Sequence, residues 1–560
     1  MVKNALSPSE QRERNIIEQR LSSPTVTLIL GMSIIGAIVY LFFLLQPSFR
    51  GDPLPYFLAL LAEFFLVSQG VLAFWTILSG RIDPRKYEYH DSQNALFGEK
   101  VGKTVIKTLH KYSNKDTRNI QLYLDHKKTS VDVFIPVYGE PVEEIRETAI
   151  AARDMYGKHT TYILDDGESD DVKKMAKEIG VGYIRRPIHD HAKAGNVNYA
   201  LSQTSGDFFI ILDADFVAKK NFIYETLPFF EHPGLAMVQT PQYYNNALNF
   251  VSKGAGYMQH VFYSMVMAGK NRFNAAFCVG TCVVFRRIAI EEIGGIYDQS
   301  KSEDIWTSLT LHEHGWETVY INKVLAEGKT PESLKAYSKQ QLRWATGSFE
   351  IFLKHNPLFN PKLTADQRLQ YFMTTSFYFN GFAILTLLLL PPLQIFFNIS
   401  PVSLSIPLWQ YALLYSGYYV MQLFLSFYAM GGLKFETIMI SAASFPIYIK
   451  AFFNALIGRD QAWSATNSKD TSYDSPFNYV RMQTYVFLFM FLTTLVGIWK
   501  SIYTSEFSIS VVWGGLLTLI LGYFIFAAVR EGRKLKAEAR AESEETTTNV
   551  KTRKAEAASS

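Results

Sequence analysis

The chain has 560 residues, room for more than one domain, with 48% hydrophobic and 15% aromatic residues and a formal net charge of only +4. This apolar composition predicts membrane spans combined with a polar domain, and the small charge gives no reason to expect a nucleic-acid partner. The only two cysteines, Cys278 and Cys282, exclude a disulfide framework and are interpreted as packing residues in one apolar run.

The N-terminal part predicts a membrane anchor. Residues 1–24 form a charged segment, predicted to be cytoplasmic because its Lys and Arg residues precede an apolar run. Residues 25–80 are predicted to contain two transmembrane helices, 25–45 and 56–78, since each run is long and apolar enough to cross a bilayer. The second contains Glu63, interpreted as a packing residue, with a channel-lining position as the alternative.

Residues 81–354 have a different character, because charged residues, Gly and Pro become frequent and short β-rich runs alternate with helical stretches. This alternation predicts a cytoplasmic α/β domain with a mostly parallel sheet covered by helices. The predicted strands are 131–136, 160–164, 182–184, 208–212, 236–239 and 282–285.

Residues 355–530 are apolar again and are predicted to form the second part of the membrane region. Four spans, 372–397, 409–430, 482–499 and 508–529, bring the predicted total to six. The segment 434–457 contains charged residues and Pro446, so an amphipathic helix at the membrane interface is preferred there over a span. The tail, 531–560, is predicted to be cytoplasmic and disordered, and the Lys and Arg distribution places both termini and the loop 458–481 in the cytoplasm.

Acidic residues follow two of the predicted strands. Asp165 and Asp166 end the second strand, and Asp213 and Asp215 end the fourth. Open α/β sheets bind ligands at the carboxyl ends of their strands, and paired carboxylates suit a divalent cation that carries a diphosphate. For Asp213 and Asp215 alone, a polar turn is the commoner interpretation. Lys193, at the start of a predicted helix, is a candidate phosphate contact.

Two more motifs lie downstream, Ser302-Glu303-Asp304 and the QQLRW run at 340–344. With DDG at 165–167 and DAD at 213–215 in this order, the chain resembles processive membrane glycosyltransferases of family 2, of the cellulose synthase type. The runs VQTPQYYNN at 238–246 and FCVGT at 277–281 add to the resemblance, which covers about residues 25–530.

The resemblance implies a nucleotide-sugar-binding domain of GT-A type inserted in a helical transmembrane bundle of about six spans plus amphipathic interface helices. It also implies roles for individual residues. These are Asp304 as the catalytic base, Asp165, Asp166, Lys193, Asp213 and Arg343 as nucleotide-sugar contacts, Asp215 with Asp213 as ligands of Mg²⁺ or Mn²⁺, Gln340 and Trp344 as acceptor contacts, and Trp463, Thr466 and Lys469 as gating-loop residues.

The implied activity is an inverting, processive hexosyltransferase that uses UDP-glucose to make a β-1,4-glucan, as a UDP-forming cellulose synthase does, and moves the polymer through its own channel. A single carboxylate base fits such a direct displacement. Alternatives are a sister synthase making β-1,3-glucan, mannan, chitin or hyaluronan, or, from another class, a transporter or scaffold with a silent nucleotide-binding domain.

The resemblance also implies partners and a location. Expected partners are a UDP-sugar donor, a growing polysaccharide acceptor, the lipid bilayer and an accessory export subunit, with no nucleic acid, at the plasma (inner) membrane. The chain departs from the family in having Ser302 at the start of the acidic triplet and Lys469 one place late in the gating-like loop. No segment resembling a cyclic-di-GMP receptor domain follows residue 529, so regulation by that messenger is not expected.

Overall fold

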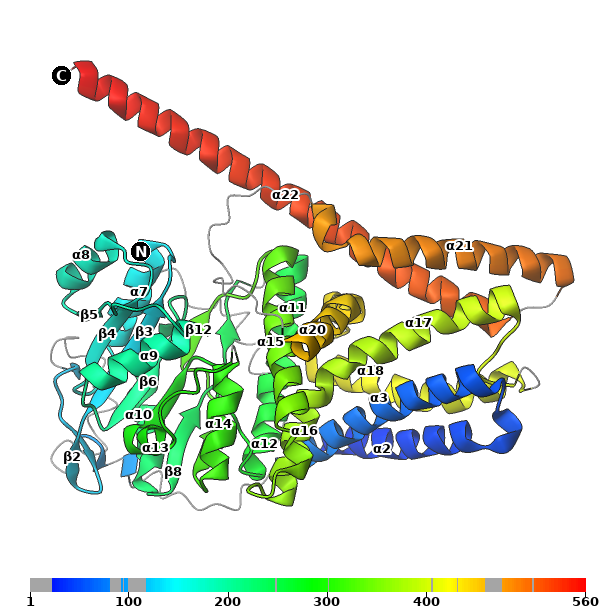
Figure 1. Ribbon diagram of the computed structural model, residues 1–560, viewed down its shortest axis with the longest axis horizontal. Coiled ribbons are helices and arrows are strands. Elements are labelled where there is room, and N and C mark those ends of the chain that lie inside the picture. Colours follow the sequence, from blue (N-terminus) through cyan, green and yellow to red (C-terminus); the bar gives the residue numbers. More distant parts are fainter. Residues whose placement is uncertain are drawn as a thin grey trace.

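The computed structural model describes residues 23–80, 92–93, 95–98, 117–246, 249–300, 302–403, 406–430, 432–458, 476–505 and 508–559. An α/β domain and a bundle of long helices lie side by side (Figure 1). The predicted gating-loop residues Trp463, Thr466 and Lys469 lie outside the described ranges.

The α/β domain contains a seven-stranded sheet with the order β11-β8-β10-β6-β3-β4-β5. Within this sheet β10 runs antiparallel to both of its neighbours, and the other pairs are parallel. The mostly parallel α/β domain inserted in a helical bundle is therefore confirmed. The strands are β3 (Val131–Val137), β4 (Thr160–Asp165), β5 (Gly182–Ile184), β6 (Phe208–Ile211), β8 (Leu235–Gln239), β10 (Val283–Arg286) and β11 (Glu317–Tyr320).

The central strand β6 is buried on both faces, as its unbroken apolar run requires. Phe208 and Ile210 point into one hydrophobic core, and Phe209 and Ile211 point into the other, because successive side chains of a strand alternate in direction. Helices α7 (Val142–Arg153) and α8 (Asp170–Ile179) cover the first face, and α9 (Ala192–Gln203), α13 (Arg287–Glu292) and α14 (Glu303–Glu313) contribute to the second.

Two smaller sheets flank the main one. The first is a hairpin of β1 (Leu122–Leu124) and β2 (Lys127–Thr129). The second has the order β7-β12-β9 and joins three segments that are distant in sequence: β7 (Val217–Ala218), β12 (Ala326–Gly328) and β9 (Tyr243–Tyr244). Because β7 begins two residues after Asp215, this small sheet lies directly beside the DAD motif.

In the described residues, six helical segments are long and apolar enough to cross a membrane. Their number matches the prediction, but their identity differs. The six segments include 435–457, which was not predicted as a span, and exclude α18 (Leu408–Met430), which was. The tyrosines and glutamines of α18 make it more polar than its neighbours. The six are α2 (Pro24–Leu45), α3 (Pro53–Ser79), Ala365–Phe397, Phe435–Ile457, α21 (Arg481–Thr504) and the part of α22 in Ile509–Ala537.

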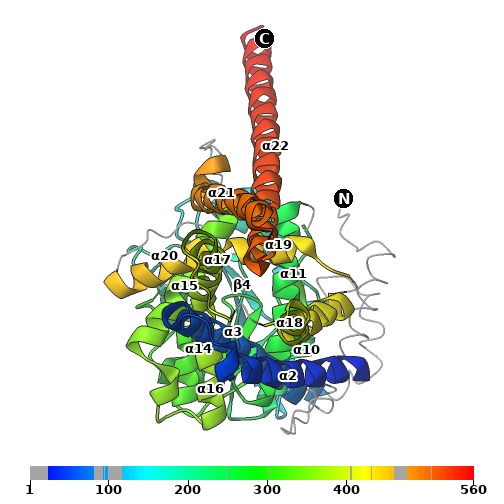
Figure 2. The ribbon, with the colours of Figure 1, turned by 90° about the vertical axis from the view of Figure 1, so that its right-hand side faces the viewer.

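The segment Phe435–Ile457 consists of two helices, α19 (Phe435–Ala443) and α20 (Phe445–Ile457), that meet at Ser444. Figures 1 and 2 show both running across the direction of α3 and α17. Length and composition allow a span here, whereas this orientation favours the predicted interface helix.

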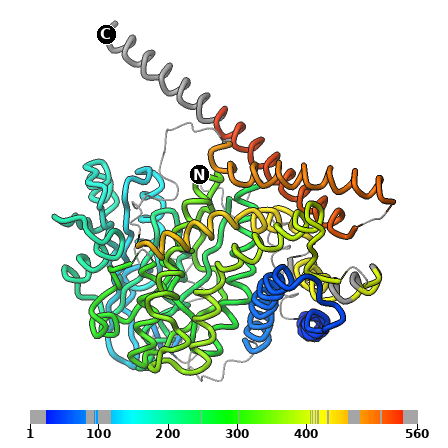
Figure 3. The backbone as a smooth tube through the Cα atoms, turned by 45° about the vertical axis from the view of Figure 1, so that its right-hand side comes forward, coloured from blue at the N-terminus to red at the C-terminus, as the bar shows by residue number. Residues whose placement is uncertain are grey.

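The long helices form two groups. Helices α2, α3 and α18 share one hydrophobic cluster, whereas α21 and α22 pack together on the other side of the bundle (Figures 2 and 3). Helix α17 (Asn380–Phe397) contacts both α3 and α22 and so joins the groups. Glu63 of α3 is 3% exposed and accepts a hydrogen bond from the Tyr419 hydroxyl of α18, which confirms its interpretation as a packing residue.

The last helix extends into the segment 531–560, for which the sequence predicts disorder. Helix α22 continues from Ile509 to Ser559 without interruption. The segment after 530 is rich in Ala, Glu, Lys and Arg, which have high helix propensity, and it extends an existing helix, so no new nucleation is needed.

Candidate active site

Lys193 and Asp213 meet at the carboxyl end of β6. Lys193 lies in the first turn of α9, where its Nζ forms an ion pair with Asp213 and donates a hydrogen bond to the Gly280 carbonyl at 2.7 Å. The backbone N–H of Asp213 donates to Thr281 Oγ1 at 2.8 Å. The lysine, the DAD motif and the FCVGT run are therefore brought together, as the resemblance implies.

Gly280 separates Lys193 from the acidic triplet. Its backbone has a φ of +89°, and a Cβ at this position would lie 3.6 Å from Asp304 Oδ2 and 3.8 Å from Lys193 Nζ. The loop is held by Gln239, whose side-chain amide donates to the Thr281 carbonyl at 2.9 Å and accepts from the Val279 N–H at 3.1 Å. The glycine thus lets the backbone pass between the cation and the carboxylate.

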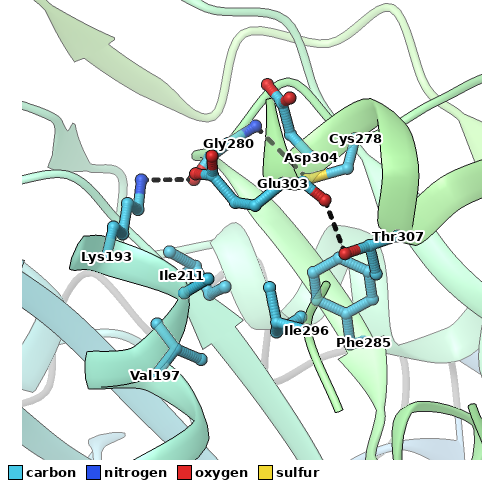
Figure 4. A pocket seen from close by; sticks show the side chains of 11 residues that line it. Lys193, Val197, Ile211, Cys278, Gly280, Phe285, Ile296, Glu303, Asp304 and Thr307 are labelled. Carbon is cyan, nitrogen blue, oxygen red and sulfur yellow. Dashed lines mark hydrogen bonds between the residues drawn. The ribbon is translucent and has the colours of Figure 1, made fainter. Parts of the chain in front are cut away.

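The acidic triplet opens helix α14, next to a small pocket (Figure 4). Figure 4 shows Glu303 reaching toward Lys193 and Gly280, whereas Asp304 points away from Glu303. The Cys278 N–H donates to Ser308 Oγ, one turn further along α14, at 2.7 Å. The FCVGT run is therefore attached directly to the helix that carries Asp304. The apolar side of the pocket is formed by Val197, Ile211, Phe285 and Ile296.

The environment of Asp304 changes its acidity. Burial, with the neighbouring Glu303 carboxylate second, raises the pKa of Asp304 to about 7, although the Ile305 N–H, Lys193 and Arg343 oppose this. Burial also raises the pKa of Glu303. A carboxylate with a pKa near neutrality can exchange a proton with a bound hydroxyl group, which is the property expected of a general base.

Helix α15 (Leu334–Lys354) carries the QQLRW run and packs closely on the acidic triplet. A Cβ on Gly347 would lie only 1.7 Å from Ser302 Oγ and 2.4 Å from Ser302 Cβ. The absence of a side chain at 347 therefore lets α15 approach the N-terminus of α14. This contact brings Arg343, one turn earlier on α15, near enough to Glu303 and Asp304 to act on their pKa values.

Gln340, Arg343 and Trp344 share one face of α15, because residues three and four positions apart are neighbours on a helix. Gln340 Oε1 is buried and accepts no hydrogen bond from the described residues. A buried acceptor without a donor is unusual and needs an explanation. A hydroxyl-rich ligand lying along this face would supply the missing donor.

Asp165 and Asp166, the predicted contacts of the nucleotide, both have hydrogen-bond partners within the protein. Asp165 accepts hydrogen bonds from the Gly167 and Ser169 N–H groups, each at 2.8 Å, and from the Tyr183 hydroxyl at 2.7 Å. Asp166 pairs with Arg186 through two 2.7 Å hydrogen bonds. Both carboxylates are buried, so in this structure they shape the loop, and their contact with a nucleotide stays a prediction.

Arg186 is a residue that sequence reasoning missed. Besides Asp166, its guanidinium donates to the Asp190 carbonyl at 2.6 Å and the Ala192 carbonyl at 3.0 Å. It thereby fixes the DDG loop to the start of α9, one residue before Lys193. The sequence did offer a hint of its importance, because Arg186 lies in the run RRPIHDH between the DDG motif and Lys193.

Asp213 and Asp215 are candidates for a divalent cation, with further carboxylates close by. Burial, followed by the charges of Asp213, Glu144 and Glu140, raises the pKa of Asp215 to about 8. A divalent cation would relieve this mutual repulsion, so the residues fit the ion. The described residues contain no group of three or more side chains arranged to hold a metal, so water or a bound diphosphate would have to complete the coordination.

Comparison with protein-family models gives two overlapping matches. Residues 129–347 match the model described as "Glycosyltransferase like family 2", and residues 290–444 match the model described as "Cellulose synthase". The two share the stretch that contains the acidic triplet and the QQLRW run.

Curated proteins give similar matches. The chain is 37% identical over 261 residues to the cellulose synthase catalytic subunit [UDP-forming] of Xanthomonas axonopodis pv. citri, covering 45% of this chain and 36% of that protein. It is 36% identical over 278 residues to the subunit of the same name from Pseudomonas fluorescens, covering 48% of this chain and 38% of that protein. The matched part thus spans little more than a third of these relatives.

Among solved structures, a mannosyltransferase from Pyrobaculum calidifontis, in complex with GDP-Man and Mn²⁺, aligns with a TM-score of 0.45 and 14% identity. The alignment covers 70% of this chain and all of that chain.

Proposed function

We propose, from the matches to the family 2 glycosyltransferase and cellulose synthase models, that the chain is an inverting, processive, UDP-forming hexosyltransferase. The observation that carries the proposal is the meeting of Lys193, Asp213 and Asp304 around Gly280, with the QQLRW helix packed on the acidic triplet. The preferred product is a β-1,4-glucan made from UDP-glucose, because the matched relatives are named cellulose synthases.

In the proposed reaction, an acceptor hydroxyl attacks the anomeric carbon of the donor sugar. The new bond joins the acceptor oxygen to that carbon, the bond to the phosphate oxygen breaks, and Asp304 takes the hydroxyl proton. Lys193 and Arg343 supply positive charge toward the departing diphosphate. A Mg²⁺ or Mn²⁺ ion held by Asp213 and Asp215 would add Lewis-acid stabilisation of the same charge.

Gln340 and Trp344 would hold the acceptor end of the polymer. The Gln340 Oε1 atom, which accepts no hydrogen bond from the described part of the chain, suits a sugar hydroxyl, and the indole of Trp344 offers a flat apolar face to a pyranose ring. A direct attack inverts the anomeric centre, so an α-linked donor gives a β-linked product.

Translocation through the membrane region is the next part of the proposal. Helix α15 packs on α20 through a shared hydrophobic cluster, and the Tyr337 hydroxyl and Ser444 Oγ are 3.0 Å apart. Helix α20 in turn contacts α17, which connects the two groups of long helices. An acceptor held at Trp344 would therefore lie beside the helical bundle, with the catalytic domain on the cytoplasmic side of an inner membrane.

Donor choice provides the test of this proposal. The purified chain in detergent is offered UDP-glucose, UDP-N-acetylglucosamine and GDP-mannose separately, with Mg²⁺ or Mn²⁺, and nucleotide release is measured. We expect release from UDP-glucose and a polymer that a β-1,4-glucan hydrolase degrades. Release from another donor would assign a sister synthase. If no donor gives nucleotide release although the chain still binds UDP, the transporter or scaffold with a silent nucleotide-binding domain would be favoured.

The pH dependence of turnover follows from the environment of Asp304. Because its pKa is raised to about 7, the carboxyl group is protonated, and inactive as a base, below that pH. We expect kcat/KM to fall about tenfold for each pH unit below about 7. Glu303→Gln removes a repelling charge and should move the midpoint about one unit toward acid. A midpoint that Glu303→Gln leaves unchanged would contradict this explanation.

A further inference from the structure

The strand β12 lies so close to the DAD motif that its last residue has no room for a side chain. A Cβ on Gly328 would lie 2.6 Å from Cζ of Phe216, the residue after Asp215. The residue after Lys329 is held as well, because the Asn246 side chain accepts from the Thr330 N–H at 2.7 Å and donates to its carbonyl at 3.0 Å. The backbone on both sides of Lys329 is therefore fixed beside the carboxylates.

The Lys329 side chain faces these carboxylates. Its Nζ pairs with Glu144 Oε1 at 2.6 Å, in the first turn of α7. Although burial opposes it, the interactions with Glu144 and then Asp215 raise the pKa of Lys329, so the ammonium group stays charged. The side chain is 48% exposed and that of Glu144 is 16% exposed, so Nζ can be reached from solvent while the carboxylate is largely covered.

The charges around this position require a cation. In the antiparallel pairing of β12 with β7, Glu327 lies opposite Val217, so the chain after Gly328 runs back past Asp215. Glu144 is the ion-pair partner of Lys329, and a diphosphate entering beside these carboxylates would be repelled. Lys193 is already paired with Asp213. Lys329 is a second ammonium group at this cluster, and its pairing with Glu144 can be exchanged for a phosphate oxygen because lysine carries three donors on a flexible stem.

We propose that Lys329 binds the diphosphate of the sugar-nucleotide donor, exchanging its pairing with Glu144 for a phosphate oxygen when the donor arrives. This inference rests on the proposed function. It makes Lys329 a donor-binding residue that lies outside the DDG, DAD, SED and QQLRW motifs. It also gives Glu144 the role of holding the lysine in place while the site is free of donor.

The test compares UDP with uridine, which lacks the phosphates, as ligands of the full chain in detergent at saturating Mg²⁺. Calorimetry is applied to the wild type and to Lys329→Met, Glu144→Gln and Lys219→Met. Lys219 is the matched control, because it directly follows β7, pairs with Glu327 of β12 at 3.0 Å and is 40% exposed. We expect Lys329→Met to weaken UDP binding about tenfold without changing uridine binding. Lys219→Met should match the wild type.

The variant Glu144→Gln shows whether Lys329 contacts the diphosphate or whether the Lys329–Glu144 ion pair only stabilises the fold. It frees Lys329, so UDP binding should be as tight as in the wild type or tighter. If Glu144→Gln and Lys329→Met both weaken UDP and uridine binding, the pair only stabilises the fold and the inference is overturned. The inference also fails if Lys329→Met binds UDP as the wild type does. A wild type that binds no UDP would instead refute the proposed function.

Discussion

Asp304→Asn is expected to abolish sugar transfer while leaving UDP binding close to that of the wild type. The amide keeps the shape of the side chain and its contact with the Ile305 N–H, but it cannot accept a proton from the acceptor hydroxyl. General-base catalysis contributes about 10²–10⁴-fold, so turnover should fall by about 10³-fold. UDP release from UDP-glucose measures the loss, and calorimetry with UDP checks the binding.

Glu303→Gln is the matched control for this substitution, since it changes the adjacent carboxyl group by the same chemistry. It should keep measurable turnover with its pH profile displaced toward acid. If Asp304→Asn polymerised sugar at the wild-type rate, another residue would be the base. If Asp304→Asn lost UDP binding as well, the side chain would take part in donor binding, which contradicts the prediction.

Much of the fold could be predicted from residue patterns alone. The six predicted strands lie within one residue of their observed bounds, because each is a short apolar run that ends at a polar turn. The strand Glu317–Tyr320 was missed, since it is short and only partly apolar. The short strands β7, β9 and β12 were also missed. They depend on pairing between distant segments, which a local pattern does not report.

The positions of some candidate site residues could be predicted from the motifs that contain them. Lys193 and Asp213 are paired in the structure, and Asp304 lies beside them across Gly280, as the order of the motifs suggested. The hydrogen-bond partners of the DDG carboxylates could not be predicted, because the sequence shows which residues carry carboxylates but not which side chains bond to them. Here Tyr183 and Arg186 bond to these carboxylates, and the contact of Asp165 and Asp166 with a nucleotide stays a prediction.

Contacts that depend on the absence of a side chain were not predictable. Gly347 was an ordinary helical glycine in the sequence, yet it sets the distance between the QQLRW helix and the acidic triplet. Gly328 acts in the same way beneath Lys329. In both places the glycine lies against a side chain that is distant in sequence, Ser302 or Phe216, so the contact is visible only after the chain has folded.

Asp215→Asn is expected to remove the cation dependence of UDP binding and to lower turnover by about 10²–10³-fold. Asp215 is buried among carboxylates, and the amide keeps its shape while removing the charge that would attract a divalent ion. The loss of several kcal/mol of charge stabilisation corresponds to a rate decrease of this order. UDP affinity is measured by calorimetry with Mn²⁺ and, separately, with EDTA.

The two conditions distinguish a cation site from a structural carboxylate. In the wild type Mn²⁺ should tighten UDP binding, whereas in Asp215→Asn the affinities with Mn²⁺ and with EDTA should be equal. With EDTA the variant should bind UDP about as tightly as the wild type, because the raised pKa of Asp215 keeps its carboxyl group mostly protonated at neutral pH when no ion is bound. Asp207→Asn is the control, since Asp207 immediately precedes the other end of β6 and bonds to Ser130. An unchanged response of Asp215→Asn to Mn²⁺ would show that the ion is held elsewhere.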